Sequence, residues 1–292
     1  MADYNYGSVR NERKFWLNFR RVIAYIVLTL MCLLCLFFFY IMIINCTRSH
    51  YQIQTSGFSF LPGTSFVDNF SAIFHDGNIP LFKGLMNSLI VSVGTVVCSV
   101  YFSAMTAYGI HVYDFKGRKV VFNFILLVMT IPTQVTALGF VNMMTAWKMT
   151  NNFIPLIVPS IAAPVVFFFM KQYMDSSLPV DIVEAARIDG ANEFRTFNSI
   201  VLPILKPAMA VQGIFTFVSS WNNYFTPSLL LSKVQYKTLP IMVYMWRCKD
   251  WASLDMGHIY MVMTVSILPV MILYFCLSKF IVGGVTLGAV KG

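Results

Sequence analysis

The chain has 292 residues, of which 58% are hydrophobic and only 11% are Asp, Glu, Lys or Arg. Soluble globular domains carry about a quarter charged residues, so this composition excludes an ordinary soluble domain and indicates an integral membrane protein. The formal net charge of +9 has the sign that basic residues beside membrane spans produce, so we infer no nucleic-acid partner.

Six apolar runs approach or exceed the roughly 20 residues that a helix needs to cross a bilayer. They cover residues 22–46, 85–110, 120–143, 153–170, 208–231 and 259–282. We therefore expect an all-α integral membrane protein with six transmembrane helices. Residues 1–21 would form an N-terminal extension, residues 22–84 the first helix and an outer loop, and residues 85–292 the membrane core.

Lys and Arg are more frequent in the N-terminal extension and in alternate connections than in the remaining ones, as Arg21, Lys119 and Arg187 illustrate. Segments that stay inside the cell carry this excess, so both termini are expected in the cytoplasm. The first run is longer than a signal-peptide core and lacks a small-residue cleavage site after it. We expect it to remain as an uncleaved anchor.

The cysteines predict no metal centre. Cys32 and Cys35 form a C-x-x-C pair inside the first run, with no histidine nearby to complete a zinc site, and small residues there are expected to pack between helices. Cys46 and Cys248 are the two cysteines expected on the outer side. The sequence leaves open whether they form a disulfide.

The second and third runs differ in their polar content. The second is rich in small residues such as Ser92, Gly94 and Ala104, which let helices approach closely, so it should be a central helix. The third contains Pro132, which frees a backbone carbonyl that neighbouring helices or a wet cavity must satisfy. Gln134 and Asn142 lie two helical turns apart on this run. They are candidates for a polar substrate pathway or for a structural hydrogen bond between helices.

A charged segment at residues 176–207 interrupts the apolar core. Ser176, Ser177 and Pro179 have the residue types of a helix start, and Gly190 is suited to end that helix in a left-handed conformation. Ile182, Ala185 and Ala186 would share one face. A second helix with Phe194, Phe197 and Val201 one turn apart should follow, until Pro203 and Pro207 interrupt it.

The same segment reads Glu184-Ala185-Ala186, then Asp189-Gly190-Ala191, then Ile200-Val201-Leu202-Pro203. This pattern resembles the cytoplasmic EAA loop of binding-protein-dependent ABC importers, and its surroundings resemble the maltose-type, carbohydrate branch from about residue 87 to the end. A solvated loop between two spans is the alternative. The resemblance implies a coupling helix that docks on a separate ATPase, with contacts at Glu184, Ala185, Ala186, Asp189, Gly190 and Pro203.

The fifth run leads into Trp221, Asn222, Asn223 and Tyr224. Polar side chains within a span tend to face a bundle interior or a solvated cavity. Amides suit sugar hydroxyls and an aromatic ring suits the apolar face of a sugar, so these residues are candidates for the substrate pathway. In importers of the resembling family, however, the partner permease often supplies most of the ligand contacts.

The resemblance also implies partners. They are a second, similar permease, two ATPase subunits, an extracellular solute-binding protein and membrane lipid, with a sugar as substrate. The terminal residues Val290, Lys291 and Gly292 resemble a tail that reaches between the ATPase subunits; a disordered end is the alternative. The chain has no P-loop, so we expect no enzyme activity, no catalytic residue and no cofactor of its own, with ATP and magnesium on the partner.

We therefore expect a permease subunit of an ATP-driven importer of sugars or oligosaccharides in the bacterial cytoplasmic membrane. The alternatives are a stand-alone carrier or channel, or an ABC permease for a glycerol phosphate ester or an amino acid. Proton-coupled carriers and voltage sensors need paired carboxylates or arginine ladders within their spans, and we find neither in the sequence. Few basic residues lie in the spans, which favours a neutral cargo over a phosphate ester.

Overall fold

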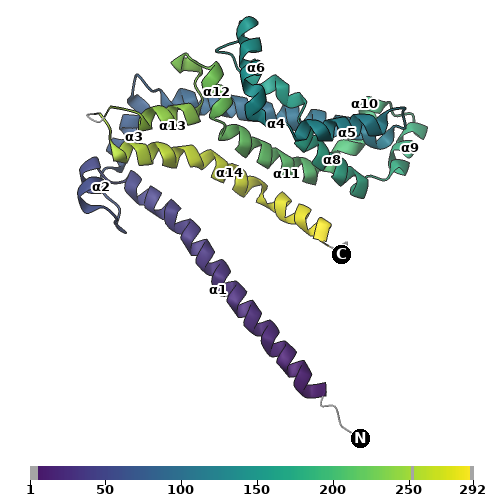
Figure 1. Ribbon diagram of the computed structural model, residues 1–292, viewed down its shortest axis with the longest axis horizontal. Helices are drawn as coiled ribbons and strands as arrows, with labels where there is room; N and C mark the ends of the chain where they lie inside the picture. The colour runs from purple at the N-terminus through teal and green to yellow at the C-terminus, as the bar shows by residue number, and fades with distance from the viewer. Residues whose placement is uncertain (1–5, 251–252, 290–292) are drawn as a thin grey trace. The chain divides into compact units, whose positions relative to one another are not determined.

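The structure, a computed structural model, describes residues 6–250 and 253–289, with side chains for residues 16–250 and 253–276. All regular secondary structure within these ranges is helical (Figure 1). The chain divides into two compact units, Met1–Phe70 with Asp255–Thr264, and Ser71–Leu254 with Val265–Gly292.

The first unit contains the long helix α1 (Tyr6–Cys46) and the short helix α2 (His50–Ser56). It also holds the first half of α3 (Phe66–His75) and the start of α14 (Met256–Ala289). The first predicted span is confirmed as part of α1, which continues through residues 6–21 without a break. The apolar part of α1 is exposed up to about residue 40, whereas Ile44 and Cys46 at its end are buried; the exposed part is expected of a surface that faces lipid or another subunit.

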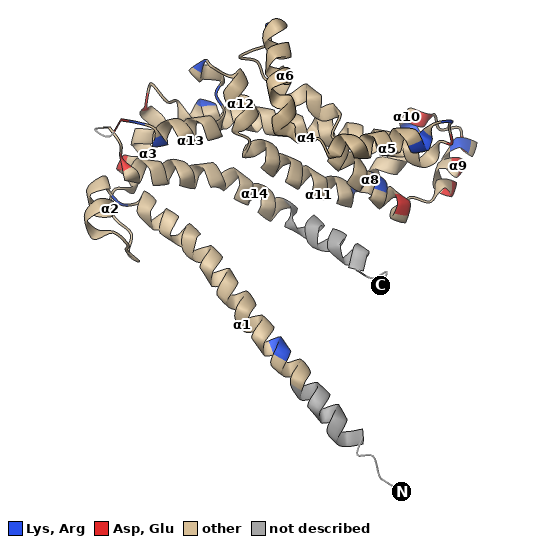
Figure 2. Cartoon of the chain, viewed as in Figure 1, with Lys and Arg blue, Asp and Glu red and all other residues tan. Residues whose placement is uncertain are grey.

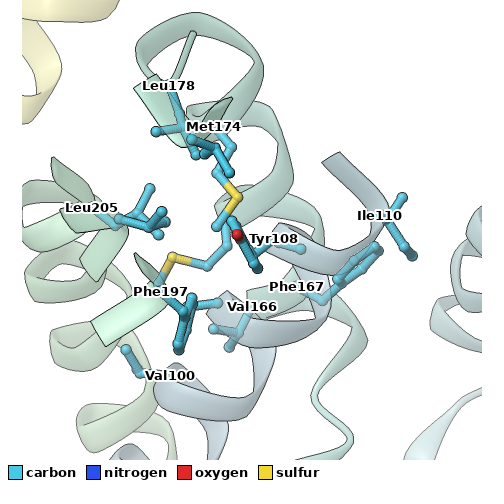
Figure 3. Close-up of a cluster of buried hydrophobic side chains, with 14 residues drawn as sticks. Val100, Tyr108, Ile110, Val166, Phe167, Met174, Leu178, Phe197 and Leu205 are labelled. Atoms are coloured by element: carbon cyan, nitrogen blue, oxygen red, sulfur yellow. The ribbon is translucent and has the colours of Figure 1, made fainter. Parts of the chain in front are cut away.

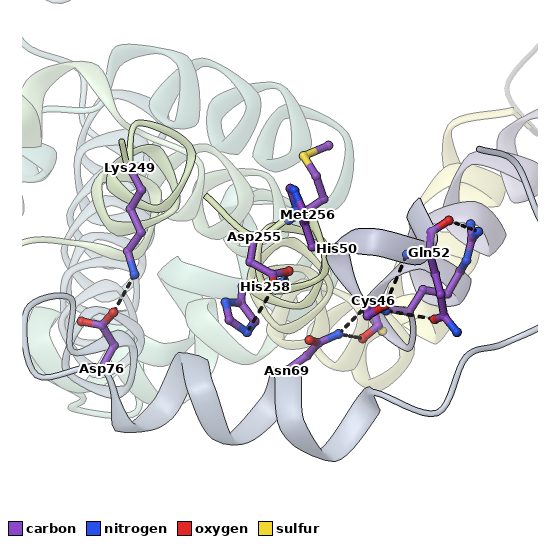
Figure 4. A network of polar contacts seen from close by, with 11 residues as sticks. Cys46, His50, Gln52, Asn69, Asp76, Lys249, Asp255, Met256 and His258 are labelled. Carbon is purple, nitrogen blue, oxygen red and sulfur yellow. Dashed lines mark hydrogen bonds and ion pairs between the residues drawn. The ribbon is translucent and has the colours of Figure 1, made fainter. Parts of the chain in front are cut away.

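A buried arginine organises the outer loop of the first unit. Arg48 is only 3% exposed, and its guanidinium donates to Asn45 Oδ1 at 3.0 Å and to the carbonyl oxygens of Gln52 and Gly57 at 2.7 Å. The Asn69 amide donates to the carbonyl oxygens of Cys46 and Arg48 at 2.9 and 3.0 Å (Figure 4). The segment after α1 therefore contains two short helices, α2 and α3, tied together by side-chain hydrogen bonds to backbone carbonyls.

The second unit is built around α4 (Leu81–Val112). This helix packs most extensively on α11 (Leu202–Trp221) and α8 (Pro164–Ser177). Ala104 and Ala107 are fully buried at these contacts, and Gly94 faces Ile157 so closely that a Cβ would lie 2.9 Å from its Cδ1. Small residues thus allow close approach, and the prediction of a central helix is confirmed.

A cluster of buried side chains joins α4 to the charged end of the unit. Tyr108, Phe167, Met174, Phe197 and Leu205 belong to it (Figure 3). These residues come from α4, α8, α11 and the turn that precedes α11. The charged segment, residues 176–207, is therefore anchored on an apolar base.

The third predicted span is not the single continuous helix that we expected. Residues 120–143 form two helices, α5 (Arg118–Met129) and α6 (Thr133–Ala146), which meet at an angle of 94°. Pro132 lies between them in an extended conformation, with φ −62° and ψ 129°. The residue before a proline is pushed out of the α region, so Ile131 and Pro132 end one helix and start the next.

The remaining spans are confirmed with shifted limits. The fourth comprises α7 (Ile154–Ile157), the 3₁₀ turn η1 (Val158–Ile161) and α8. The fifth predicted run, 208–231, is wrong at its end, because α11 stops at Trp221 and a separate α12 (Phe225–Leu230) follows. Two more short elements, η3 (Val234–Tyr236) and α13 (Leu239–Arg247), precede α14.

Within the described ranges, five helices are long and apolar enough to cross a membrane, or six with the bent pair as one span. Charged residues of the second unit lie mainly near the ends of its long helices (Figure 2). Cys46 and Cys248, whose pairing the sequence leaves open, are both free thiols. The side of the membrane that each end faces stays a prediction.

Candidate functional site

The charged segment folds as an elbow, defined here as α9 (Val180–Ile188), residues 189–192 and α10 (Glu193–Thr196). The expected helix start at Ser176 and Ser177 is wrong. Both serines finish α8, and the Ser176 hydroxyl donates to the Tyr173 carbonyl at 2.9 Å. The chain then extends through Pro179, which precedes the first residue of α9.

The glycine break is confirmed. Gly190 has φ +77°, a left-handed conformation that costs glycine little because it has no Cβ. Its N–H donates to the Arg187 carbonyl, and the N–H of Ala191 donates to the Ala186 carbonyl, both at 3.0 Å. Asn192 then caps α10, since its Oδ1 accepts from the Arg195 N–H at 2.8 Å.

The buried face of α9 differs from the predicted one. Val183 and Ala186 are buried, whereas Ile182 and Ala185 are exposed. Two large apolar side chains of the elbow point away from the core. Ile188 is 87% exposed and Phe194 is 74% exposed. Solvent-facing apolar side chains at the tip of a charged elbow are suited to contact with another protein.

Of the predicted coupling residues, Ala186 is buried and the others are exposed: Glu184, Ala185, Asp189, Gly190 and Pro203. Pro203 does not interrupt the helix, because it lies in the first turn of α11, where proline is tolerated. A π turn at Phe197–Val201 joins α10 to α11, and Pro207 is accommodated inside α11. The two predicted interruptions are therefore wrong, while the docking role of these residues stays a prediction.

One carboxylate ties the two halves of the elbow to α4. Glu193 Oε1 accepts from Arg187 Nε at 2.8 Å, and Glu193 Oε2 accepts from the Tyr108 hydroxyl at 2.9 Å. The Arg187 guanidinium lies over the Tyr113 ring, 5.3 Å from its centroid, at cation–π distance. Burial raises the pKa of the Tyr113 hydroxyl, and the nearby Glu193 carboxylate raises that pKa further.

A cavity of about 580 Å³ opens inside the second unit. Its walls come from α4, α6, α7, η1, α8, α11 and α12. None of the described residues that line it is charged. Its polar lining consists of hydroxyl and amide side chains: Ser88, Thr95, Ser99, Thr133, Thr136, Ser160, Gln212, Thr216, Ser219, Ser220, Asn223, Thr226 and Thr238.

Two of these hydroxyls have no hydrogen-bond partner among the described residues. Thr95 Oγ1 and Thr238 Oγ1 are buried and unpaired. Buried polar atoms are normally hydrogen-bonded, so each one left unpaired calls for a water or ligand partner. This central cavity therefore has room and hydrogen-bonding capacity for a small polar solute.

The model of one protein family, described as binding-protein-dependent transport system inner membrane component, matches residues 99–286. The chain belongs to this family. The prediction made from the EAA pattern is thereby confirmed, and the family description itself makes the chain an inner-membrane component whose transport depends on a binding protein. The chain is thus a multi-pass permease of the bacterial inner membrane.

Individual relatives carry names of sugar transport systems. The arabinooligosaccharides transport system permease protein AraQ of Bacillus subtilis is 35% identical over 77% of this permease and 79% of its own length. The probable starch degradation products transport system permease protein AmyC of Thermoanaerobacterium thermosulfurigenes is 28% identical over 87% and 90%.

A solved structure, a bacterial ABC transporter involved in import of the acidic polysaccharide alginate, has the same fold. Its TM-score is 0.78 at 22% identity, over 92% of this permease and 97% of that chain.

The predicted pathway residues of the permease are distributed over different places. Asn223 lines the central cavity. Trp221 is 2% exposed, stacks on Phe217 with ring centroids 5.5 Å apart, and donates to the Ser266 carbonyl at 3.0 Å. This geometry is that of a packing residue. Asn222 is exposed.

The other three predicted pathway residues lie outside the cavity lining. Tyr224 is 39% exposed, with its ring against Tyr244. Gln134 and Asn142 are both exposed on α6. Contact of any of these residues with substrate stays a prediction.

Sequence reasoning missed most of the cavity lining. Ser99 belongs to the small residues of α4 that were expected to serve close packing, and neither Thr95 of α4 nor Gln212 of α11 was singled out. A polar side chain in the middle of an apolar run was the available signal for Gln212. The predicted tail contacts Val290, Lys291 and Gly292 lie outside the described residues. In the described ranges, no group of His, Cys, Asp or Glu could hold a metal ion.

Proposed function

We propose that this chain is the permease subunit of an ATP-driven ABC importer of neutral sugars or oligosaccharides. The observation that carries the proposal is a central cavity with hydroxyl and amide walls in a chain 35% identical to an arabinooligosaccharide permease. The alginate importer has the same fold with an acidic cargo. The side chains of the path, and not the fold, must therefore select the cargo.

The cavity chemistry favours a neutral cargo. A phosphate ester or an amino acid would need charged side chains to replace its lost hydration, because burying an unpaired charge is costly. The lining residues that the structure describes offer none. Sugar hydroxyls can both donate and accept, and they match the unpaired hydroxyls of Thr95 and Thr238.

The free energy of ATP hydrolysis would reach the membrane spans through the elbow. We infer that the transporter has two ATPase subunits, which bind ATP and magnesium. One of them contacts the exposed Ile188 and Phe194 of this chain, and the other contacts a second, similar permease. When the two ATPases bind ATP and close on each other, the spans would tilt so that the central path opens to the outside. Hydrolysis would then return the path to its inward-open state. A solute-binding protein would deliver the sugar on the outer side, both termini would be cytoplasmic, and the terminal residues would touch the ATPase.

Reconstitution tests this function. The purified chain alone in vesicles should transport no arabinooligosaccharide, whereas the complex with the second permease, the ATPases and the loaded binding protein should transport it only with ATP inside. Glycerol phosphate serves as the charged control cargo and should not be taken up. ATP-independent uptake by the chain alone would establish a stand-alone carrier or channel instead, and uptake of glycerol phosphate would overturn the neutral cargo.

A further inference from the structure

The two halves of the elbow are held to α4 by different kinds of contact. The C-terminal half, α10 with the π turn that follows it (Phe197–Val201), is held by apolar packing, since the Phe197 ring centroid lies 5.4 Å from that of Tyr108 and 5.7 Å from that of Tyr101. The Tyr101 hydroxyl also donates to Asn198 Oδ1 at 3.2 Å. This half would remain attached if the Glu193 carboxylate were removed.

The other half, α9, is packed into the same cluster by Val183, which is fully buried, but its last turn is held differently. The last turn of α9 carries Arg187 and the exposed Ile188. Arg187 reaches Tyr108 of α4 through the Glu193 carboxylate, and its guanidinium also lies over the ring of Tyr113, the residue that follows α4. Arg187 and Glu193 are 36% and 47% exposed, and ion pairs this exposed add little to the stability of a fold. The pair nevertheless links the last turn of α9 to α4.

The same α4 forms a wall of the central cavity. Tyr108 lies near the charged end of the helix, while Thr95 and Ser99 line the cavity. At about 1.5 Å per residue, Tyr108 and Thr95 are roughly 20 Å apart along the helix axis. Because a packed helix is stiff at this length, a displacement of α4 at Tyr108 reaches the cavity wall with little loss.

We propose that Glu193 is a positioning residue for coupling, which clamps the tip of α9 to α4 so that movement of the elbow displaces the cavity wall. The inference rests on the proposed docking of the elbow on an ATPase. Without the carboxylate, α9 would still bind its partner through Ile188 but would move partly independently of α4. ATP would then be hydrolysed with less sugar carried per cycle.

The test measures sugar transported per ATP hydrolysed in the reconstituted complex. Glu193→Ala should lower this ratio about fivefold or more, in the usual range of coupling between sites, while the ATPase still co-purifies. Tyr108→Phe should lower it less. The exchange Arg187→Glu with Glu193→Arg rebuilds the ion pair and should recover part of the ratio, which a merely structural defect would not do.

Asp76→Asn is the matched control. It breaks the ion pair between Asp76 and Lys249, 2.7 Å long, away from the elbow, and should leave the ratio unchanged. A wild-type ratio in Glu193→Ala with the ATPase bound would overturn the inference alone, as would an equal fall in the control. A wild-type complex that never retains an ATPase would overturn the proposed function and this inference together.

Discussion

Substitutions at Gly190 should separate the shape of the elbow from its side-chain contacts. A Cβ added at this position would meet no atom within 4 Å, so the cost of a substitution arises from the backbone alone. An L-residue in the left-handed conformation costs about 1–2 kcal/mol, and asparagine costs less than alanine because it is enriched there.

Proline at this position should be far worse. Its ring fixes φ near −65° in place of the +77° observed, and it has no N–H for the Arg187 carbonyl. The combined cost is about 3 kcal/mol or more, which corresponds to a loss of roughly a hundredfold in correctly turned elbows.

The assay is sugar uptake in proteoliposomes beside ATP hydrolysis, with membrane insertion checked by extraction yield. Uptake should be reduced least by Gly190→Asn, more by Gly190→Ala and most by Gly190→Pro. The proline variant should insert into the membrane but fail to couple ATP hydrolysis to transport. Normal uptake by Gly190→Pro would refute the role of the turn. Equal losses for asparagine and proline would show that a side chain, and not the backbone conformation, causes the defect.

Three further predictions concern the cavity, the loop and a packed tryptophan. Thr95→Val should weaken sugar transport severalfold by raising the apparent KM, since it removes a hydroxyl that is unpaired in the cavity wall; an unchanged KM would count against the site. Burial alone would raise the pKa of Asp76, but Lys249 and two backbone N–H donors outweigh it and hold that pKa below its usual value. The resulting stability is present above about pH 4 and is lost as the pH falls through the lowered pKa, so the difference in Tm between wild type and Asp76→Asn should close in acid. Trp221→Phe should lower stability by about 1 kcal/mol, because the bond to the Ser266 carbonyl is lost, with sugar selectivity unchanged; a change in selectivity would restore Trp221 to the pathway.

The sequence could predict features that depend on local backbone chemistry. The left-handed turn at Gly190 and the central position of α4 both follow from residue types, and both are confirmed. Pro132 indicated that the helix of the third span is interrupted. The angle between the two resulting helices depends on how they pack on their neighbours, so the bend of 94° was not predictable.

Features that depend on contacts between distant segments were predicted poorly. Trp221 looks like a ligand residue in the sequence, yet its N–H is used by Ser266 of another helix. Val183, and not Ile182, faces the core of the second unit, because apolar residues surround both positions and periodicity cannot distinguish them. The link from Arg187 through Glu193 to Tyr108 has no local signature, since it joins residues of three helices.

The most direct test of the account is a photo-crosslinking amino acid placed at Ile188, at the exposed tip of α9. A matched probe at Leu229 of α12, which is 47% exposed, serves as the control at the predicted outer side. The account predicts that the probe at position 188 captures a nucleotide-hydrolysing subunit in membranes and that the probe at position 229 does not. Absence of that subunit from the position 188 adduct, or its capture at position 229, would contradict the account.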